Sequence, residues 1–191
     1  MEPPGAHGSH MMRRSPDLTG TEILSRRLVL RAFVSGDALD IFPEATLEIS
    51  RYMTWEPAAS FDAFSVIWPE WLDRIKAGIE LSLVIRQRLT EEFLGVAGLH
   101  DIGIPERTVG IWIKQGAHRM GYGRESIAAI MRWASAEVGA KAFIYPVVEQ
   151  NVPSRRLAES QGGAVIGGRE LRKPSGHVFQ EVVYRIPAPS G

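Results

Sequence analysis

The sequence predicts an α/β (α+β) fold in one domain, because segments with the period of a strand and segments with the period of a helix follow one another along the chain. Leu28, Leu30 and Ala32 alternate with Arg27, Val29 and Arg31, whereas residues 60–77 carry apolar side chains three and four apart. Short apolar runs joined by polar turns follow between residues 80 and 114. The chain has 191 residues, of which 45% are hydrophobic, enough to bury one full core.

The first part of the domain is predicted to be a strand followed by helices. Residues 27–32 have the alternation of a strand with one buried face. Ser35-Gly36-Asp37 then opens a helix over residues 38–42. Residues 60–77 predict an amphipathic helix that is interrupted near Pro69. The aromatic residues of this helix fit two roles, packing in the core or covering a substrate cleft.

The remainder of the chain predicts a sheet with helices between some of its strands. Three strands joined by short turns indicate an antiparallel meander over residues 80–88, 93–101 and 108–114. A helix, a strand, a second helix and a final pair of strands are predicted at residues 124–138, 142–148, 154–161, 165–171 and 177–186. The final pair flanks Lys173-Pro174-Ser175-Gly176, a sequence that favours a hairpin loop.

Both ends of the chain are expected to lie outside the folded domain. Gly8-Ser9-His10-Met11 resembles a cloning remnant, and Pro3-Pro4-Gly5 discourages regular structure, so residues 1–20 are assigned to a leader. The domain then spans residues 21–187, and residues 188–191 form a short tail.

Charge and cysteine content exclude several classes of function. The formal net charge is zero, which gives no reason to expect nucleic acid as a partner. The absence of cysteine excludes a disulfide framework, a thiolate metal site and a cysteine nucleophile. The sequence has neither an apolar stretch long enough to cross a bilayer nor an apolar signal core, so we expect a cytoplasmic protein without a membrane partner.

A glycine-containing turn between a predicted strand and a predicted helix is the first candidate binding site. It reads His118-Arg119-Met120-Gly121-Tyr122-Gly123-Arg124-Glu125. Glycines let the backbone come close to a ligand, and the free N–H groups at the start of a helix bind anions. The pattern is therefore open to two readings, a pyrophosphate site and an ordinary turn.

A second motif identifies a family that the first motif also fits. It reads Asn151-Val152-Pro153-Ser154-Arg155-Arg156-Leu157-Ala158-Glu159-Ser160-Gln161-Gly162. This stretch resembles the Asn-x-x-Ser-x-Arg-x-x-Glu-x-x-Gly helix of the GNAT N-acetyltransferases that include the ribosomal-protein N-terminal acetyltransferases. The earlier turn resembles the Gln/Arg-x-x-Gly-x-Gly/Ala coenzyme A loop of the same superfamily. The departures are His118, where Gln or Arg is common, and Gly163, where Phe commonly follows the glycine.

The resemblance implies a GNAT fold and a binding mode for acetyl-CoA as cosubstrate, without a metal. The fold is a mixed, mostly antiparallel sheet whose central strands splay apart to admit the acetyl-pantetheine arm. The pantetheine amides would pair with the backbone of Ile111, Trp112 and Ile113. The pyrophosphate would lie against His118, Arg119, Met120, Gly121, Tyr122 and Gly123, with positive charge from Arg119 or Arg124. Asn151 would contact the pantetheine, cap the following helix, or do both.

The same resemblance suggests candidates for catalysis. Ser154 is the candidate for assisting the departing thiolate, because Ala158 replaces a tyrosine that many GNAT enzymes have at that place. A serine hydroxyl is a poor acid, so a hydrogen bond or a water relay is its expected contribution, and a helix cap is the alternative. Glu149 and His100 are the candidates for a general base, against the alternatives of a solvated carboxylate and a structural histidine.

The acceptor is expected to be a primary amine, either a small molecule or the N-terminus of a peptide or protein. Tyr52, Trp55 and Trp68 are candidates for shaping its pocket, although fold alone does not decide the substrate. The alternative function is a GNAT-like module of weak activity that binds acyl-CoA or a protein partner, because Ala158 removes the usual tyrosine. We expect a monomer or a homodimer.

Overall fold

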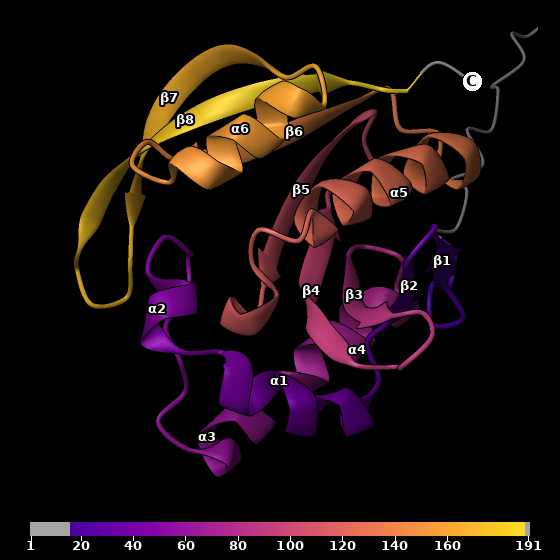
Figure 1. Cartoon of the computed structure of the whole chain (residues 1–191), viewed down its shortest axis with the longest axis vertical. Coiled ribbons are helices and arrows are strands. Elements are labelled where there is room, and N and C mark those ends of the chain that lie inside the picture. Colours follow the sequence, from indigo (N-terminus) through magenta and orange to yellow (C-terminus); the bar gives the residue numbers. More distant parts are fainter. Residues whose placement is uncertain (1–15, 190–191) are drawn as a thin grey trace, which may run out of the picture.

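The predicted mixed fold is confirmed by the computed structural model, which describes residues 16–189 (Figure 1). Its eight strands form one sheet in the order β1-β2-β3-β4-β5-β6-β8-β7. All neighbouring strands run antiparallel except β5 and β6, which are parallel. The strands are β1 Glu22–Leu24, β2 Leu28–Ala32, β3 Leu81–Gln87, β4 Phe93–His100, β5 Glu106–Ile113, β6 Ala142–Val148, β7 Ala164–Arg172 and β8 Val178–Pro187.

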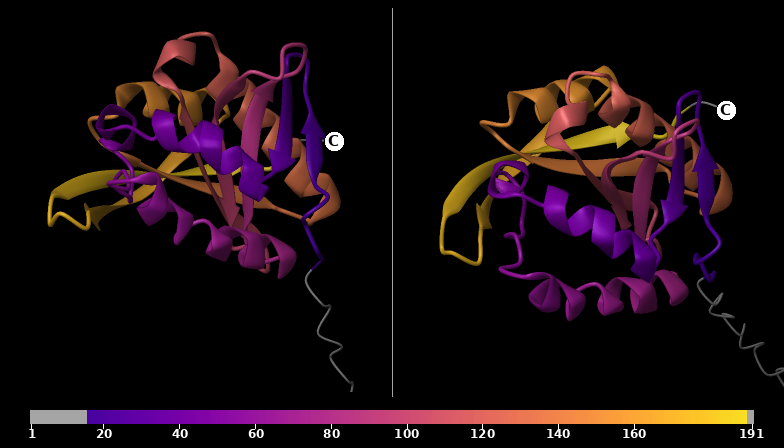
Figure 2. Two further views of the ribbon diagram at one scale, coloured as in Figure 1. Left: turned by 90° about the horizontal axis from the view of Figure 1, so that it is seen from below. Right: turned by 60° about the horizontal axis from the view of Figure 1, so that its bottom comes forward.

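Helices cover both faces of the sheet, which is the middle of three layers. On one side α1 packs against β4 and α4 against β3, while α5 packs against β2 and β5 and α6 against β6. Figure 2 shows these two sets of helices on opposite sides of the strands. The helices are α1 Ala38–Glu44, α2 Leu47–Ser50, α3 Phe61–Ser65, α4 Pro69–Lys76, α5 Tyr122–Glu137 and α6 Val152–Ser160, with short 3-10 turns η1 Ser35–Asp37 and η2 Gln115–Ala117.

The element boundaries follow local sequence signals where such signals exist. The meander is confirmed, because β3, β4 and β5 pair antiparallel in chain order. The helix predicted over residues 60–77 is two helices, since Pro69 takes the first position of α4, where its missing N–H is tolerated. Ser60 begins α3 by accepting the N–H of Ala63 at 3.1 Å. Two elements, β1 and α2, are not predicted from the sequence, because they have only three and four residues.

The hydrophobic core occupies both sides of the sheet. Val29 is buried together with Leu28 and Leu30, because α5 covers the second face of β2, so this strand is not limited to one buried face. Leu18 is also buried, and its N–H donates to the carbonyl of Ile75 at 3.2 Å. It lies within the range assigned to the leader, whereas the suggested cloning remnant lies outside the described residues. Within residues 16–189, no helix has both the length and the hydrophobicity to cross a bilayer.

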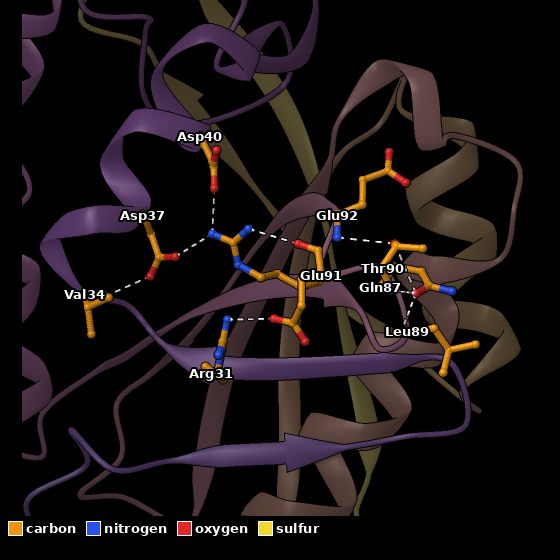
Figure 3. Close-up of polar contacts among 10 residues, drawn as sticks. Arg31, Val34, Asp37, Asp40, Gln87, Leu89, Thr90, Glu91 and Glu92 are labelled. Carbon is orange, nitrogen blue, oxygen red and sulfur yellow. Dashed lines mark hydrogen bonds and ion pairs between the residues drawn. The ribbon is translucent and has the colours of Figure 1, made fainter.

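Ion pairs of Arg86 join β3 to the start of α1 through Asp37 and Asp40. Figure 3 shows these two carboxylates. The Arg86 guanidinium donates to the carboxylates of Asp37 and Asp40, both at 2.7 Å. The second oxygen of Asp37 accepts the N–H of Val34 at 3.0 Å. Burial lowers the pKa of Arg86, but the two carboxylates outweigh that effect and hold the pKa above its usual value. The cluster is therefore a charged anchor between sheet and helix.

Replacing Arg86 by Met should lower the free energy of unfolding by about 3 kcal/mol, because Asp37 would remain buried without a cation. The Asp37 side chain is only 10% exposed, so water cannot substitute for the guanidinium. Arg31→Met is the matched control, since its partner Glu91 and Arg31 itself are exposed and such pairs contribute about 1 kcal/mol at most. Urea unfolding followed by circular dichroism measures both variants. Equal losses would contradict the anchoring role of Arg86.

Candidate active site

The parallel strands β5 and β6 diverge after a short paired stretch. They pair only at Glu106 with Ala142, Arg107 with Phe143 and Thr108 with Ile144. Beyond these residues β5 remains bound to β4 and β6 remains bound to β8. The edge of β5 that faces β6 is thus left without a strand partner over residues 109–113 within the described chain. Such an edge can accept an extended group that carries amides, as an added strand would.

The loop between β5 and α5 presents a row of free N–H groups. Arg119 and Gly121 have positive φ angles of 62° and 80°, which turn the chain into the start of α5. Within residues 16–189, the N–H groups of Arg119 to Arg124 have no hydrogen-bond acceptor. Packing explains the glycine at position 123, because a Cβ there would lie only 3.2 Å from Leu157 of α6. The loop is therefore suited to an anion, by its donors and by the dipole of α5.

Arg27 and Glu125 hold this loop against the start of β2. Glu125 accepts hydrogen bonds from the Ser25 hydroxyl and from the Arg27 Nε, both at 2.7 Å. Arg27 also donates to the carbonyl of Met120 at 2.9 Å, and its guanidinium lies 4.6 Å from the ring centre of Tyr122. Burial raises the pKa of Glu125, but these donors outweigh burial and leave the pKa below its usual value. The role of Arg27 is not predictable from the sequence, since its partners Glu125 and Met120 lie far away in the chain.

His118 fixes the other end of the loop. Its Nε2 lies 2.7 Å from the carbonyl oxygen of Ile113, the last residue of β5. A carbonyl only accepts, so Nε2 carries the hydrogen and His118 donates. His118 therefore shapes the turn through its hydrogen bond to the backbone of β5. Arg119 and Arg124, the predicted sources of positive charge, are both exposed.

The second motif forms the beginning of α6. Asn151 caps this helix, because its Oδ1 accepts the N–H of Ser154 at 3.3 Å. The Ser154 hydroxyl lies 2.9 Å from the phenol oxygen of Tyr145, which belongs to the diverging part of β6. Tyr145 is only 2% exposed. From the sequence, Tyr145 is only one residue of the predicted strand 142–148, because no local pattern distinguishes its hydroxyl.

A cavity of about 460 Å³ lies on the other side of the sheet from α5. Tyr52 and Trp55 line it together with residues of α1, α3 and α4, and its floor is formed by β4 and β5. Trp112 and Pro146 also line it, so the cavity reaches the diverging parts of β5 and β6. Trp68 does not belong to the lining and packs against Phe33, with ring centres 5.9 Å apart. The volume is in the range of pockets for small ligands or for the end of a chain.

His100 and Glu80 form a polar pair in the wall of this cavity. Glu80 Oε1 lies 3.2 Å from His100 Nδ1, and Arg74 holds the same carboxylate through bonds of 2.7 and 2.8 Å. Burial raises the pKa of Glu80, but the donors Arg74 and His100 outweigh it and set the pKa below its usual value. An ionised Glu80 accepts the proton on Nδ1, which leaves the lone pair of His100 on Nε2. Glu149, the other predicted base, is exposed and does not line the cavity.

Comparison with known proteins identifies the fold and the family. The family model described as an acetyltransferase (GNAT) domain matches residues 27–164. No curated protein sequence matches the chain significantly. Among solved structures, Mycobacterium smegmatis RimJ in complex with CoA-disulfide is 17% identical with a TM-score of 0.77, over 88% of each chain.

Two proteins of Vibrio cholerae are similar to the same degree. A spermidine N-acetyltransferase in complex with CoA and spermine is 19% identical with a TM-score of 0.74, over 86% of this chain and 97% of that one. A candidate ribosomal-protein-serine acetyltransferase is 20% identical with a TM-score of 0.73, over 88% of this chain and 98% of that one. At these identities the structural likeness concerns the fold. The family model, however, spans most of the chain, so the protein belongs to the GNAT family of acetyltransferases and is an acetyl-CoA-dependent N-acetyltransferase.

Proposed function

We propose that the protein transfers the acetyl group of acetyl-CoA to a primary amine by direct attack within a ternary complex, with the N-terminal amine of a peptide or protein as the leading acceptor. The observation that carries this proposal is the row of free N–H groups from Arg119 to Arg124 beside the unpaired edge of β5. One feature suits a pyrophosphate and the other suits the amides of pantetheine. Only residues 114–118 separate the two features in the chain, so they can hold neighbouring parts of one extended ligand.

In this proposal each part of coenzyme A has its own contacts. The backbone of Ile111 to Ile113 pairs with the pantetheine, and the loop from His118 to Gly123 takes the pyrophosphate. Arg119 and Arg124 are exposed beside this loop and add positive charge. A depression next to the loop is lined by Arg26, Arg27 and Arg132 together with Glu125. Its three arginines suit the phosphate on the ribose of coenzyme A. Asn151 orients the start of α6 toward the pantetheine.

The amine acceptor enters the cavity lined by Tyr52 and Trp55. Aromatic walls suit an aliphatic or aromatic side chain next to the amine, and the ring of Trp55 packs edge-on against Trp112 at 6.2 Å between centres. Trp68 lies outside the lining and packs against Phe33, whose ring packs edge-on against Trp71 of the lining at 5.2 Å between centres. A peptide would place its first residue in the cavity and leave the following residues outside, which fits a volume of about 460 Å³.

His100 is the proposed general base, in preference to Glu149. It lines the cavity, and its Nδ1 is engaged by Glu80, whereas Nε2 has no hydrogen-bond partner within residues 16–189. Nε2 can therefore take a proton from the acceptor's ammonium group before attack, or from the amine nitrogen once it has bonded to the acetyl carbon. Transfer then forms a carbon–nitrogen bond as the carbon–sulfur bond breaks, and Ser154 assists the sulfur that leaves. An α-amino group has an unperturbed pKa of about 8, so such an acceptor needs less help from a base than a lysine does.

Calorimetric titration with acetyl-CoA, followed by mass spectrometry of amine acceptors, tests this function. We expect binding with one acetyl-CoA per chain and acetylation of at least one member of a set of peptides with different first residues. Spermidine is the small-amine comparison in the same set. Absence of acetyl-CoA binding at millimolar concentration would overturn the proposal. Binding without transfer to any acceptor would favour the weakly active binding module instead.

A further inference from the structure

We propose that Tyr145 is a positioning residue for catalysis: its buried phenol donates a hydrogen bond to the Ser154 hydroxyl and so directs the proton of Ser154 toward the sulfur of the leaving thiolate. This inference rests on the proposed function, since it concerns the same acetyl transfer. It assigns a role to a buried polar group that no other step uses.

The geometry brings these two hydroxyls together from different elements. Tyr145 is the first residue of β6 beyond its last pair with β5, so it lies where the two strands begin to diverge. Ser154 lies in the first turn of α6, and its N–H is bound by Asn151. The phenol and serine oxygens are 2.9 Å apart. The pair therefore lies beside the opening that the proposal assigns to the pantetheine.

Burial decides which of the two oxygens donates. Within residues 16–189, Ser154 is the only hydrogen-bond partner of the Tyr145 phenol, and Tyr145 is 2% exposed. If Ser154 donated, the phenol proton would be buried without an acceptor, which costs about 1–3 kcal/mol. Ser154 is partly exposed, so its own proton can be directed to solvent or to a ligand. Donation from Tyr145 to Ser154 satisfies both groups.

The environment of Tyr145 keeps this donor available. Burial raises the pKa of Tyr145 above its usual value, and the hydrogen bond with Ser154 only partly counteracts burial. The phenol is therefore protonated throughout the neutral range. A buried tyrosinate is correspondingly unfavourable, so Tyr145 orients Ser154 and does not itself pass on a proton.

The step that Ser154 assists is balanced without a change in its own protonation. The amine nitrogen forms a bond to the acetyl carbon, and the carbon–sulfur electron pair leaves with the sulfur. The proton lost by the amine goes to the base or to water, and the thiolate accepts a hydrogen bond from Ser154. Since thiols have unperturbed pKa values of about 8.5, a thiolate stabilised in this way can leave without full protonation by a weak acid such as serine.

Tyr145→Phe is the decisive variant, because it removes the hydroxyl and keeps the ring. We expect kcat to fall about tenfold to a hundredfold, while the Kd for acetyl-CoA changes less than about threefold, because the bond acts mainly in the transition state. Tyr184→Phe is the matched control. Tyr184 lies opposite Tyr145 in the β6–β8 register and is 1% exposed, but its hydroxyl bonds to Glu159 and Arg155. The Tyr184→Phe variant should keep the wild-type kcat even if its melting temperature is lower.

Ser154→Ala and the double variant separate positioning from structural support. Ser154 is partly exposed, so Ser154→Ala should fold even if Tyr145→Phe folds poorly, and it removes the same hydrogen bond. We expect Ser154→Ala to lower kcat at least as much as Tyr145→Phe does. Adding Tyr145→Phe to Ser154→Ala should then produce no further fall in kcat, because the hydroxyl to be positioned is absent. A further tenfold fall, or an unchanged kcat in Tyr145→Phe alone, would overturn this inference while leaving an active wild type and the proposed function in place. A wild-type protein that binds no acetyl-CoA would overturn both.

Discussion

Gly121→Asp is expected to weaken acetyl-CoA binding about a hundredfold. Gly121 lies in the middle of the free N–H groups and precedes the first residue of α5. A Cβ at this position would lie 3.4 Å from Nη2 of Arg27, so a carboxylate there would lie next to that guanidinium and add a negative charge beside the proposed pyrophosphate site. Like charges close together at a binding site cost several kcal/mol, and about 2.7 kcal/mol corresponds to a hundredfold change in Kd. Calorimetry or fluorescence titration at low and high salt measures the effect, which should shrink as salt screens the repulsion.

Gly121→Asn is the matched control for this variant. The φ angle of Gly121 is 80°, a left-handed conformation that asparagine and aspartate tolerate better than other side chains do. The two substitutions therefore impose similar backbone strain and similar bulk, and they differ mainly in charge. We expect Asn to weaken binding less than about tenfold. If Asn and Asp weaken binding equally, strain and not charge controls the loop, and the assignment of this loop to a pyrophosphate fails.

His100→Gln should lower kcat/KM by about a hundredfold to a thousandfold, the usual contribution of a general base. Glutamine retains polar contacts in the cavity wall but has no basic nitrogen. Binding of acetyl-CoA should remain within about threefold of wild type, because His100 lines the cavity next to Tyr52 and Trp55 and does not belong to the loop from His118 to Gly123. Initial rates with a saturating peptide amine, measured over a range of pH, provide the test.

Glu80→Gln is the companion variant for His100. It keeps an acceptor for Nδ1 but removes the charge that Arg74 holds in place, so a fall of about tenfold in kcat/KM is expected. The loss from Glu80→Gln should disappear in the His100→Gln background, because the base to be oriented is gone. If His100→Gln kept full activity, water and not His100 would accept the proton of the amine, and His100 would be a structural residue of β4.

Local patterns were sufficient for most of the fold. Strand 142–148 was predicted at the bounds that β6 has, and β3, β4, β7 and β8 were predicted within two residues at each end. Alternation and turn residues act over a few positions, which is the range over which such patterns are informative. The same reasoning failed for β1 and α2. Each is too short to display a period, and β1 exists because it pairs with β2.

The candidate site divides along the same line. Each of the two motifs is one contiguous stretch of sequence, the turn around Gly121 and the helix start at Asn151. The sequence alone therefore determined the two motifs, the family and the expected cosubstrate. The partners Arg27 with Glu125, Glu80 with His100 and Tyr145 with Ser154 come from different elements. Only the tertiary structure decided these contacts, the cavity next to Tyr52 and Trp55, and the location of Trp68 outside it. The physical reason is that such contacts depend on the register of the sheet and on how helices pack across it, and a side chain's partner on another element leaves no period in its own segment.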